Sequence, residues 1–325
     1  MENNRMKIFL RALYVILLVL PLSMVHAQQE SHYAQNMFNN LAINPGFAGS
    51  VAGICASGIY RQQWVGFKDG DGNSVAPQTY SLNIHSPINI LHGGVGLSLY
   101  QDKLGFSKEV GLKIIYAYRV DVGMGNLGIG LQVGFINGNI DFNKLREGAR
   151  DQGDYILEGG KGEESDILLD FGFGLHYVVP DKFYVGLSST RLSESKSPDD
   201  ILAYKTKRHY YLSAGYEFSF PRNPSFVIAP SILVKSDAVK TEFDLAALLK
   251  YNNKVWGGVS YSSFRVMDPF SVLLGLKIKD VRIGYAYTIP TSAIGSSGSH
   301  EVMVGYCFRI NLDKGRRSYR NTRFL

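Results

Sequence analysis

Residues 270–288, FSVLLGLKIKDVRIGYAYT, alternate between two kinds of side chain. In its first half, from Phe270 to Ile278, every second residue is large and apolar, and the residues between them are Ser, Leu, Gly and Lys. Its second half, from Val281 to Thr288, alternates Val, Ile and Tyr with Arg, Gly, Ala and Thr. Successive side chains of a β-strand point to opposite faces. The stretch therefore predicts two antiparallel strands joined at Asp280, with one apolar face and one small or charged face.

The same period of two recurs along the chain after residue 50. It predicts about 14 strands, at residues 54–65, 78–85, 93–102, 109–119, 127–136, 168–179, 183–191, 209–220, 226–235, 241–251, 254–264, 270–279, 281–288 and 300–309. Tyr and Phe gather near the ends of several of these strands. Aromatic residues at strand ends are typical of a membrane barrel, but soluble strands carry them too.

The lengths of the connections decide between a membrane barrel and a soluble sandwich, since both carry such alternation. Connections after odd-numbered strands are often long, as at 66–77, 137–167, 192–208 and 289–299, although 236–240 and 265–269 are short. Connections after even-numbered strands are mostly short, as at 180–182, 221–225, 252–253 and 280. Outer-membrane barrels have an even strand count, short periplasmic turns and long outer loops. We therefore predict an all-β fold, a transmembrane antiparallel β-barrel of about 14 strands with apolar side chains toward lipid.

The N-terminus has the pattern of a signal peptide. Arg5, Lys7 and Arg11 precede an apolar run at residues 13–20, which is too short to span a membrane as a helix, and a small-residue cleavage site ends at Ala27. We expect a signal peptide at 1–27, a periplasmic lead-in segment at 28–50, the barrel at 51–310 and a basic periplasmic tail at 311–325. An exported chain excludes nucleic acid as a partner and leaves the bacterial outer membrane as the predicted location.

No pattern of catalytic, metal-binding or cofactor-binding residues stands out. The seven His residues are scattered without ligand spacing, and the Gly-x-Gly pairs at 128–130 and 172–174 fall inside strands, where a dinucleotide motif cannot form. We therefore predict no enzyme activity and no cofactor. Cys55 and Cys307 lie in the first and last strands, which are neighbours in a closed barrel. In an oxidising compartment they form either a disulfide or two unpaired small apolar residues.

Several short blocks are similar to a known family. They are HYAQNMFN at 32–39, INPGFAG at 43–49, YRQQW at 60–64, GYAY at 284–287 and GSHE at 298–301. The chain resembles the PorP/SprF family, membrane proteins of the type IX secretion system. The family blocks fall on Asn44, Pro45, Gly49, Arg61, Trp64, His300 and Glu301. Arg61 and Glu301, on strands that would be neighbours, are predicted to form an ion pair in the lumen.

The resemblance implies a component that binds other type IX secretion proteins and helps to export or anchor a surface protein, such as a gliding adhesin. It also implies contact with outer-membrane lipid. The alternative is a passive outer-membrane pore or solute transporter, because about 14 strands enclose a lumen. A lipid-modifying barrel enzyme would need a nucleophile beside a base, and no such pair can be recognised in the sequence.

Overall fold

The computed structural model describes residues 30–308, apart from 69, 71, 73–74, 148–161, 199–203, 264, 266–267 and 293–294. The predicted signal peptide at 1–27 and the predicted basic tail at 311–325 lie outside the described residues. Among the residues that are described, no helix is both long and apolar enough to cross a membrane.

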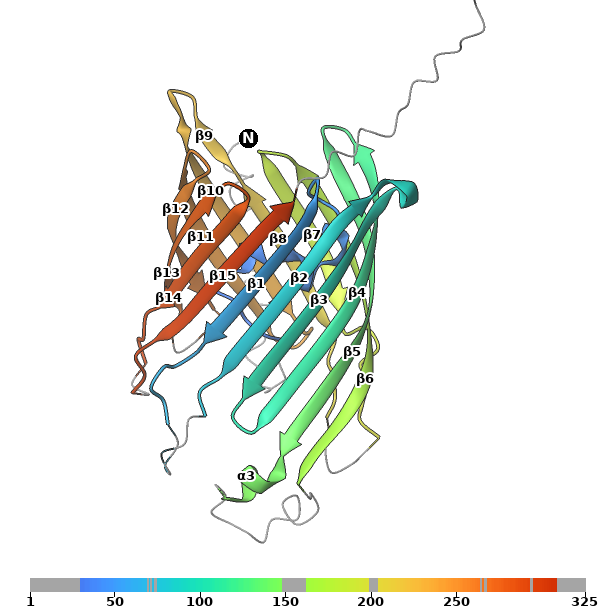
Figure 1. Cartoon of the computed structure of the whole chain (residues 1–325), viewed down its shortest axis with the longest axis vertical. Coiled ribbons are helices and arrows are strands. Elements are labelled where there is room, and N and C mark those ends of the chain that lie inside the picture. The colour runs from blue at the N-terminus through green and yellow to red at the C-terminus, as the bar shows by residue number, and fades with distance from the viewer. Residues whose placement is uncertain are drawn as a thin grey trace, which may run out of the picture.

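The described strands form one antiparallel sheet that closes into a barrel with steeply tilted strands (Figure 1). The strands are β1 (Ile54–Gln62), β2 (Gln78–Ile88), β3 (Gly93–Leu104), β4 (Ser107–Val122), β5 (Gly125–Asp141), β6 (Glu163–Val179), β7 (Phe183–Thr190), β8 (His209–Tyr216), β9 (Phe218–Phe220), β10 (Asn223–Ser236), β11 (Thr241–Tyr251), β12 (Val255–Ser262), β13 (Phe270–Ile278), β14 (Val281–Thr288) and β15 (Ser299–Phe308). Pairing of β1 with β15, and of β10 with β11, leaves no open edge. Both β8 and β9 pair with β10 and are separated only by Glu217, so the wall is a closed barrel of 14 strands, as predicted.

The apolar faces of the strands point outward. In β13, the five alternating apolar residues from Phe270 to Ile278 are between 39% and 62% exposed, whereas Ser271 and Leu273 face inward and are 2% and 1% exposed. A soluble sandwich would bury the apolar set. Only a surrounding of acyl chains gives such a surface a favourable environment, as in outer-membrane barrels.

Aromatic side chains form two outward-facing belts at the ends of the strands. At one end, Tyr60 and Tyr80 of neighbouring strands have ring centroids 4.8 Å apart. At the other end, Tyr216 packs with Phe218, with centroids 4.3 Å apart. Aromatic belts flank the apolar band of membrane barrels at both interfaces. The Tyr and Phe residues that the sequence places near strand ends are therefore the residues that form these belts.

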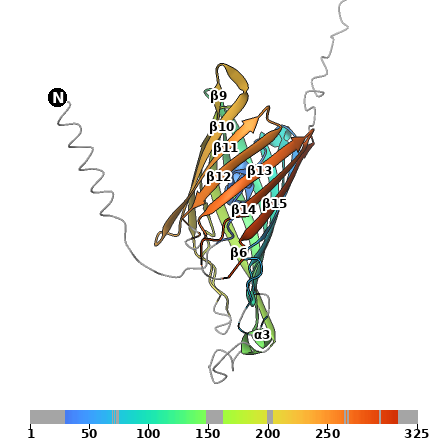
Figure 2. The same cartoon turned by 90° about the vertical axis from the view of Figure 1, so that its left-hand side faces the viewer.

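We call the rim that bears the long connections the outer rim, and the rim where β1 begins and β15 ends the inner rim. The connection between β5 and β6 is longer than those between the other strands, and α3 (Phe142–Glu147) lies in it at the tip of the molecule (Figure 2). At the outer rim β6 extends past β7 and stays paired with β5. We predicted a loop from residue 137 to 167, but residues 137–141 still pair with 163–167. The alternation of apolar residues stops there because this part of the wall stands beyond the lipid, where an outward polar side chain has no desolvation cost.

The described part of the predicted periplasmic lead-in, residues 30–50, lies inside the barrel. It contains three short helices, η1 (Asn36–Phe38), α2 (Asn40–Ile43) and η2 (Pro45–Phe47), and a further short helix, η3 (Asn89–Leu91), lies in the turn after β2. Hydrogen bonds join residues 30–50 to β4, β6, β7, β10, β11 and β15. This placement corrects the prediction of a periplasmic lead-in segment, and we call residues 30–50 the plug.

Candidate functional site

The plug begins near the outer rim, where the carboxylate and the backbone oxygen of Glu30 together meet donors from four strands and from Arg191. Arg191, next to the end of β7, donates through Nε to Glu30 Oε1 at 3.1 Å, and Nζ of Lys113 on β4 lies 3.8 Å from the same oxygen. The remaining donors are the Thr190 hydroxyl at 3.1 Å, the Tyr211 hydroxyl, and Nζ of Lys235, which bonds to the Glu30 backbone oxygen at 3.0 Å. Buried charges are retained where opposite charges and hydrogen bonds compensate them. Glu30 thus fixes the start of the plug to the wall.

Arg191 also connects the plug to an outer connection. Its Nη2 forms an ion pair with Glu109 on β4, and Glu109 accepts a hydrogen bond from Tyr100 at 2.7 Å. The hydroxyl of Tyr204, in the connection between β7 and β8, donates to the same carboxylate. Tyr204 is 4% exposed and packs with Ile136, Phe142 and Leu168. A continuous chain of charged contacts therefore runs from the outer connection to Glu30.

Glu301 and Arg61 hold the next part of the plug. They face each other in the register of β15 and β1, and both are buried. Glu301 accepts hydrogen bonds from the backbone N–H groups of Ala34 and Gln35, each at 2.8 Å, and Arg61 donates to the backbone oxygen of His32. We predicted a direct ion pair between the two, but within the described residues none joins them. Because the plug passes alongside, both charged groups use their hydrogen bonds on its backbone.

Apolar and aromatic contacts fill the middle of the lumen. Tyr33 and Ala34 of the plug pack with Leu273, Met303 and other buried residues of β1, β11, β12 and β14. Phe38 contacts Trp256, with ring centroids 5.5 Å apart. The lumen core is therefore built jointly by plug and wall, and the plug occupies the interior that an open pore would leave to water.

The Asn44-Pro45-Gly46 turn fits into a gap made by glycines of β5 and β6. Asn44 Oδ1 accepts the N–H of Gly46 at 2.8 Å and thereby caps η2, and Asn44 Nδ2 donates to the backbone oxygen of Leu175 at 2.9 Å. A Cβ on Gly46 would lie 2.8 Å from the oxygen of Gly128, which is closer than real contacts allow. The alternating glycines of β5 and β6 leave room for this approach, since at Gly128 and Gly174 the nearest group is the plug.

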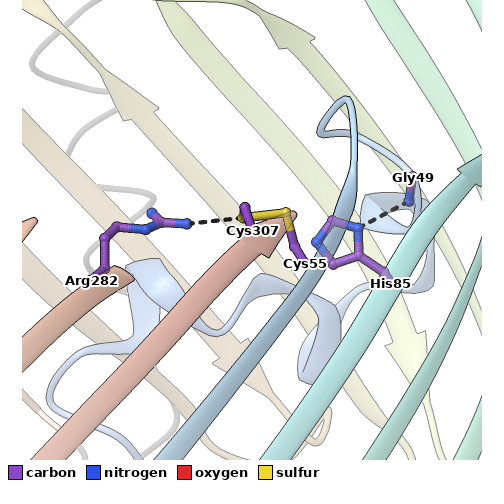
Figure 3. Close-up of a disulfide and its surroundings, with 5 residues drawn as sticks. All are labelled: Gly49, Cys55, His85, Arg282 and Cys307. Atoms are coloured by element: carbon purple, nitrogen blue, oxygen red, sulfur yellow. Dashed lines mark hydrogen bonds between the residues drawn. A yellow bond between two sulfur atoms is a disulfide. The ribbon is translucent and has the colours of Figure 1, made fainter. Parts of the chain in front are cut away.

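Near the inner rim the plug turns back toward the wall. Gly49 has φ +69°, and its N–H donates to Nδ1 of His85 at 3.3 Å. Close by, Cys55 and Cys307 occupy opposite positions on β1 and β15, and the structure joins them in a disulfide across 252 residues of sequence. Figure 3 shows this bond between His85 on one side and Arg282, whose Nη2 lies 4.0 Å from the sulfur of Cys307, on the other.

Trp64 and His300 are placed differently from the other family positions. Trp64, just past β1, donates through Nε1 to Asp268 at 3.2 Å, and its backbone N–H donates to the Ser299 hydroxyl at 3.1 Å. It therefore ties outer connections together. The His300 ring faces outward, where Nδ1 lies 2.6 Å from the Tyr285 hydroxyl, and it belongs to the outer aromatic belt.

The structure thus brings five of the seven family positions, Asn44, Pro45, Gly49, Arg61 and Glu301, into the interface between plug and wall. Glu30, Glu109 and Arg191 were not predicted as functional residues from the sequence. The sequence held one indication of them. Charged residues such as Lys113 occupy inward positions of strands, and a charge that faces the lumen needs an oppositely charged partner there. Among the described residues, no group of three His, Cys, Asp or Glu side chains could hold a metal ion.

Solved structures share the barrel fold. The TodX deltaS2S3 mutant, a monoaromatic hydrocarbon channel, matches with a TM-score of 0.51 and 12% sequence identity, over 83% of this chain and 94% of that one. The toluene transporter TbuX of Ralstonia pickettii matches with a TM-score of 0.49 and 11% identity, over 83% and 93% of the two chains. Omp33 of Acinetobacter baumannii matches with a TM-score of 0.44 and 10% identity, over 81% and 100%. At such identities the likeness concerns the fold alone.

No curated protein matches the chain. The family model for the type IX secretion system membrane protein PorP/SprF matches residues 25–306, a span that includes the plug and nearly all of the barrel. This chain belongs to the PorP/SprF family of type IX secretion system membrane proteins.

Proposed function

We propose that this barrel binds other type IX secretion components and an exported surface protein, such as a gliding adhesin, and helps to export or anchor that protein. The observation that carries the proposal is the plug. Its contacts run from Glu30 near the outer rim to Gly49 near the inner rim. With the lumen occupied, the surfaces that remain for function are the two rims and the outer wall.

The same observation disfavours a passive pore or solute transporter. Conduction needs a continuous polar path through the lumen. Here the plug binds charged side chains of the lumen, such as Lys113. The middle of the lumen is closed by apolar contacts, such as that of Phe38 with Trp256. Membership of a secretion family agrees with a binding role. We assign no chemical step to any residue, and the proposed role requires no cofactor.

The orientation follows from the lengths of the connections. We propose that the inner rim faces the periplasm, so that the tail at 311–325 meets periplasmic partners, and that the extended β5–β6 hairpin faces outward. The apolar belt between the rims contacts outer-membrane lipid. We also propose cleavage of the signal peptide after Ala27, which Edman sequencing of the exported protein tests by reading Gln28 first.

Deletion of the gene in its host tests the proposed function. We expect one surface protein, or a small set, to disappear from the cell surface, and wild-type chain supplied in trans to restore it. Type IX secretion proteins should co-purify with a tagged copy of the chain from detergent extracts. An unchanged surface and secreted proteome after deletion would contradict the proposal.

A further inference from the structure

The outer wall carries an open, apolar hollow of about 580 Å³ on β15, β1, β2, β3 and β4, which lie side by side on the near side of the barrel in Figure 1. At its floor Gly58 has no side chain, and the residues paired with it in the sheet are Val304 on β15 and Leu82 on β2. A Cβ at Gly58 would meet only the oxygen of Ser81, at 3.8 Å. The hollow is therefore a gap in a surface that faces acyl chains, and we call it the wall groove.

The wall groove reaches the outer aromatic belt. Tyr60 and Tyr80 of this belt line it, and so do Leu99 and Gln101 of β3 and Val110 of β4. An unfilled gap beside these side chains would forfeit their dispersion contacts. Within the membrane an acyl chain is the group that restores these contacts, so the wall groove fits one acyl chain.

Two lysines lie directly beyond the outer end of the wall groove. Lys103 follows Gln101 on the outward face of β3, Lys108 precedes Val110 on the outward face of β4, and the register pairs the two lysines with each other. Both are exposed. The Cβ atoms of such a pair lie about 4.5–5.5 Å apart, and like charges at this separation repel. An anion bound between the two ammonium groups removes that repulsion.

No carboxylate occupies a neighbouring position on the outward face in the described part of the wall. The other residues paired with the lysines are Gln78 on β2 and Asn139 on β5, and both are neutral. The nearest acid on that face of β5 is Asp141, which forms an ion pair with Lys144 at 2.8 Å. The positive charge of the lysine pair is therefore not compensated by the wall around it.

The acids next to the lysines in the sequence are used inside the barrel. Asp102 accepts a hydrogen bond from the Thr79 hydroxyl at 2.6 Å. Glu109 forms the ion pair with Arg191 that connects the plug to the outer connection. Because successive residues of a strand point to opposite faces, both carboxylates lie on the face away from the lysines.

The ligand that fits this arrangement is a lipid with a phosphate. Two ammonium groups attract a dianion more strongly than a monoanion, and lysine binds phosphate as a point charge. The lysines lie just past the tyrosines of the belt, and interfacial tyrosines mark the level of the lipid headgroups. We propose that the wall groove binds a phosphate-bearing lipid of the leaflet at the outer rim, with the phosphate between Lys103 and Lys108 and an acyl chain over Gly58. The proposal is independent of the proposed function.

Native mass spectrometry tests this proposal, because it counts the lipids that remain on a barrel released from non-ionic detergent micelles. We would titrate the mature protein with dioleoyl phosphatidic acid, which carries a phosphate monoester, and with dioleoyl phosphatidylcholine, which has the same chains and no net charge. Inorganic phosphate and hexaglutamate would be added as competitors. The first competitor lacks acyl chains, and the second stands for an acidic protein partner.

We expect one phosphatidic acid to bind at saturation, and phosphatidylcholine to bind at least about tenfold more weakly. The double substitution Lys103→Gln and Lys108→Gln should weaken binding of phosphatidic acid by about ten- to a hundredfold, because hydrogen bonds to charged groups are lost. The double substitution Lys182→Gln and Lys254→Gln is the matched control. It removes the same charge from two exposed lysines in turns at the inner rim and should leave binding unchanged.

Gly58→Leu tests the acyl-chain part of the site. The new side chain fills the wall groove, and binding of phosphatidic acid should weaken by about three- to tenfold. High salt should weaken binding to the unsubstituted protein and to Gly58→Leu, because the lysines remain exposed to solvent ions. It should have little effect on what binding remains in the variant without Lys103 and Lys108.

Equal binding of the two lipids, or full binding by the variant without Lys103 and Lys108, would overturn the proposal. Displacement of the lipid by inorganic phosphate at equal concentration, or by hexaglutamate, would also overturn it, because the site would then not select a lipid. Full binding by Gly58→Leu would overturn the placement of the acyl chain. The mobility of each variant on unheated gels shows that it is folded. The surface proteome of the deletion strain tests the proposed function separately.

Discussion

Arg191 donates to the carboxylate of Glu30 over 3.1 Å, and this contact joins the end of β7 to the first described residue of the plug. The two side chains are 1% and 10% exposed. Arg191 has φ +55°, a backbone conformation that is uncommon outside glycine and that the surrounding contacts must maintain. The outer end of the plug is therefore held by a buried, charged contact between residues far apart in the sequence.

Replacing Glu30 should destabilise the plug strongly. Glu30→Gln leaves Lys113 and Arg191 near a neutral group, and loss of one partner of a buried ion pair costs about 3–5 kcal/mol. The free energy of unfolding, from urea titration of the protein in micelles, measures this loss. Glu194→Gln is the control, since Glu194 pairs with Arg208 at a more exposed position. Equal losses in the free energy of unfolding for the two substitutions would contradict the role of Glu30 in holding the plug.

Glu301 and His300 are neighbours in the sequence with opposite roles. Glu301→Ala leaves the buried N–H groups of Ala34 and Gln35 without an acceptor, at a cost of about 1–3 kcal/mol for each. His300→Ala removes only the outward contact with Tyr285. We expect proteolysis within residues 30–50 to accelerate in the first variant and not in the second. Similar proteolysis in both would argue against the plug contact.

At Gly46 the backbone of β5 leaves no room for a side chain. Gly46→Ala places a Cβ 2.8 Å from the oxygen of Gly128, so plug or wall must shift, and overpacking of this kind costs about 1–3 kcal/mol. Gly58→Ala is the matched control, because a Cβ there would meet only the oxygen of Ser81 at 3.8 Å. The temperature at which heating changes the mobility of the barrel on gels should fall for Gly46→Ala and stay unchanged for Gly58→Ala.

The disulfide between Cys55 and Cys307 should form in the exported protein. Non-reducing gels should show a faster-migrating denatured chain that slows on reduction, because the bond closes a loop across 252 residues of sequence. Cys55→Ser should abolish the difference and lower the free energy of unfolding by about 2–4 kcal/mol. Identical migration with and without reductant would show that the thiols stay unpaired.

The wall of the barrel could be predicted from the sequence because its rules are local. Alternation along β13 and β14 identifies two faces, and the connection lengths separate the two rims. Closure makes the strands of Cys55 and Cys307 neighbours, but the sequence left open whether the two thiols are bonded. Alternation missed residues 137–141 of β5 and 163–167 of β6, where mostly polar residues continue the hairpin outside the apolar belt.

The plug could not be predicted in this way because its contacts are long-range. Glu30 meets Thr190 across 160 residues of sequence, and no period in residues 30–50 encodes such a contact. Two features of the wall did carry information: inward charges such as Lys113, and small inward residues such as Gly128 and Gly174. Together they indicate a lumen shaped for a polar segment of backbone, but they do not identify that segment.

Conductance in planar lipid bilayers tests whether the plug closes the barrel and leaves only its surfaces for binding. The mature protein should be compared with a variant lacking residues 30–50, each shown to be folded by its mobility on unheated gels. If the plug closes the barrel, the complete protein carries no steady ion current and the variant carries an open-channel current. A stable open channel formed by the complete protein, with a conductance equal to that of the variant, would contradict it.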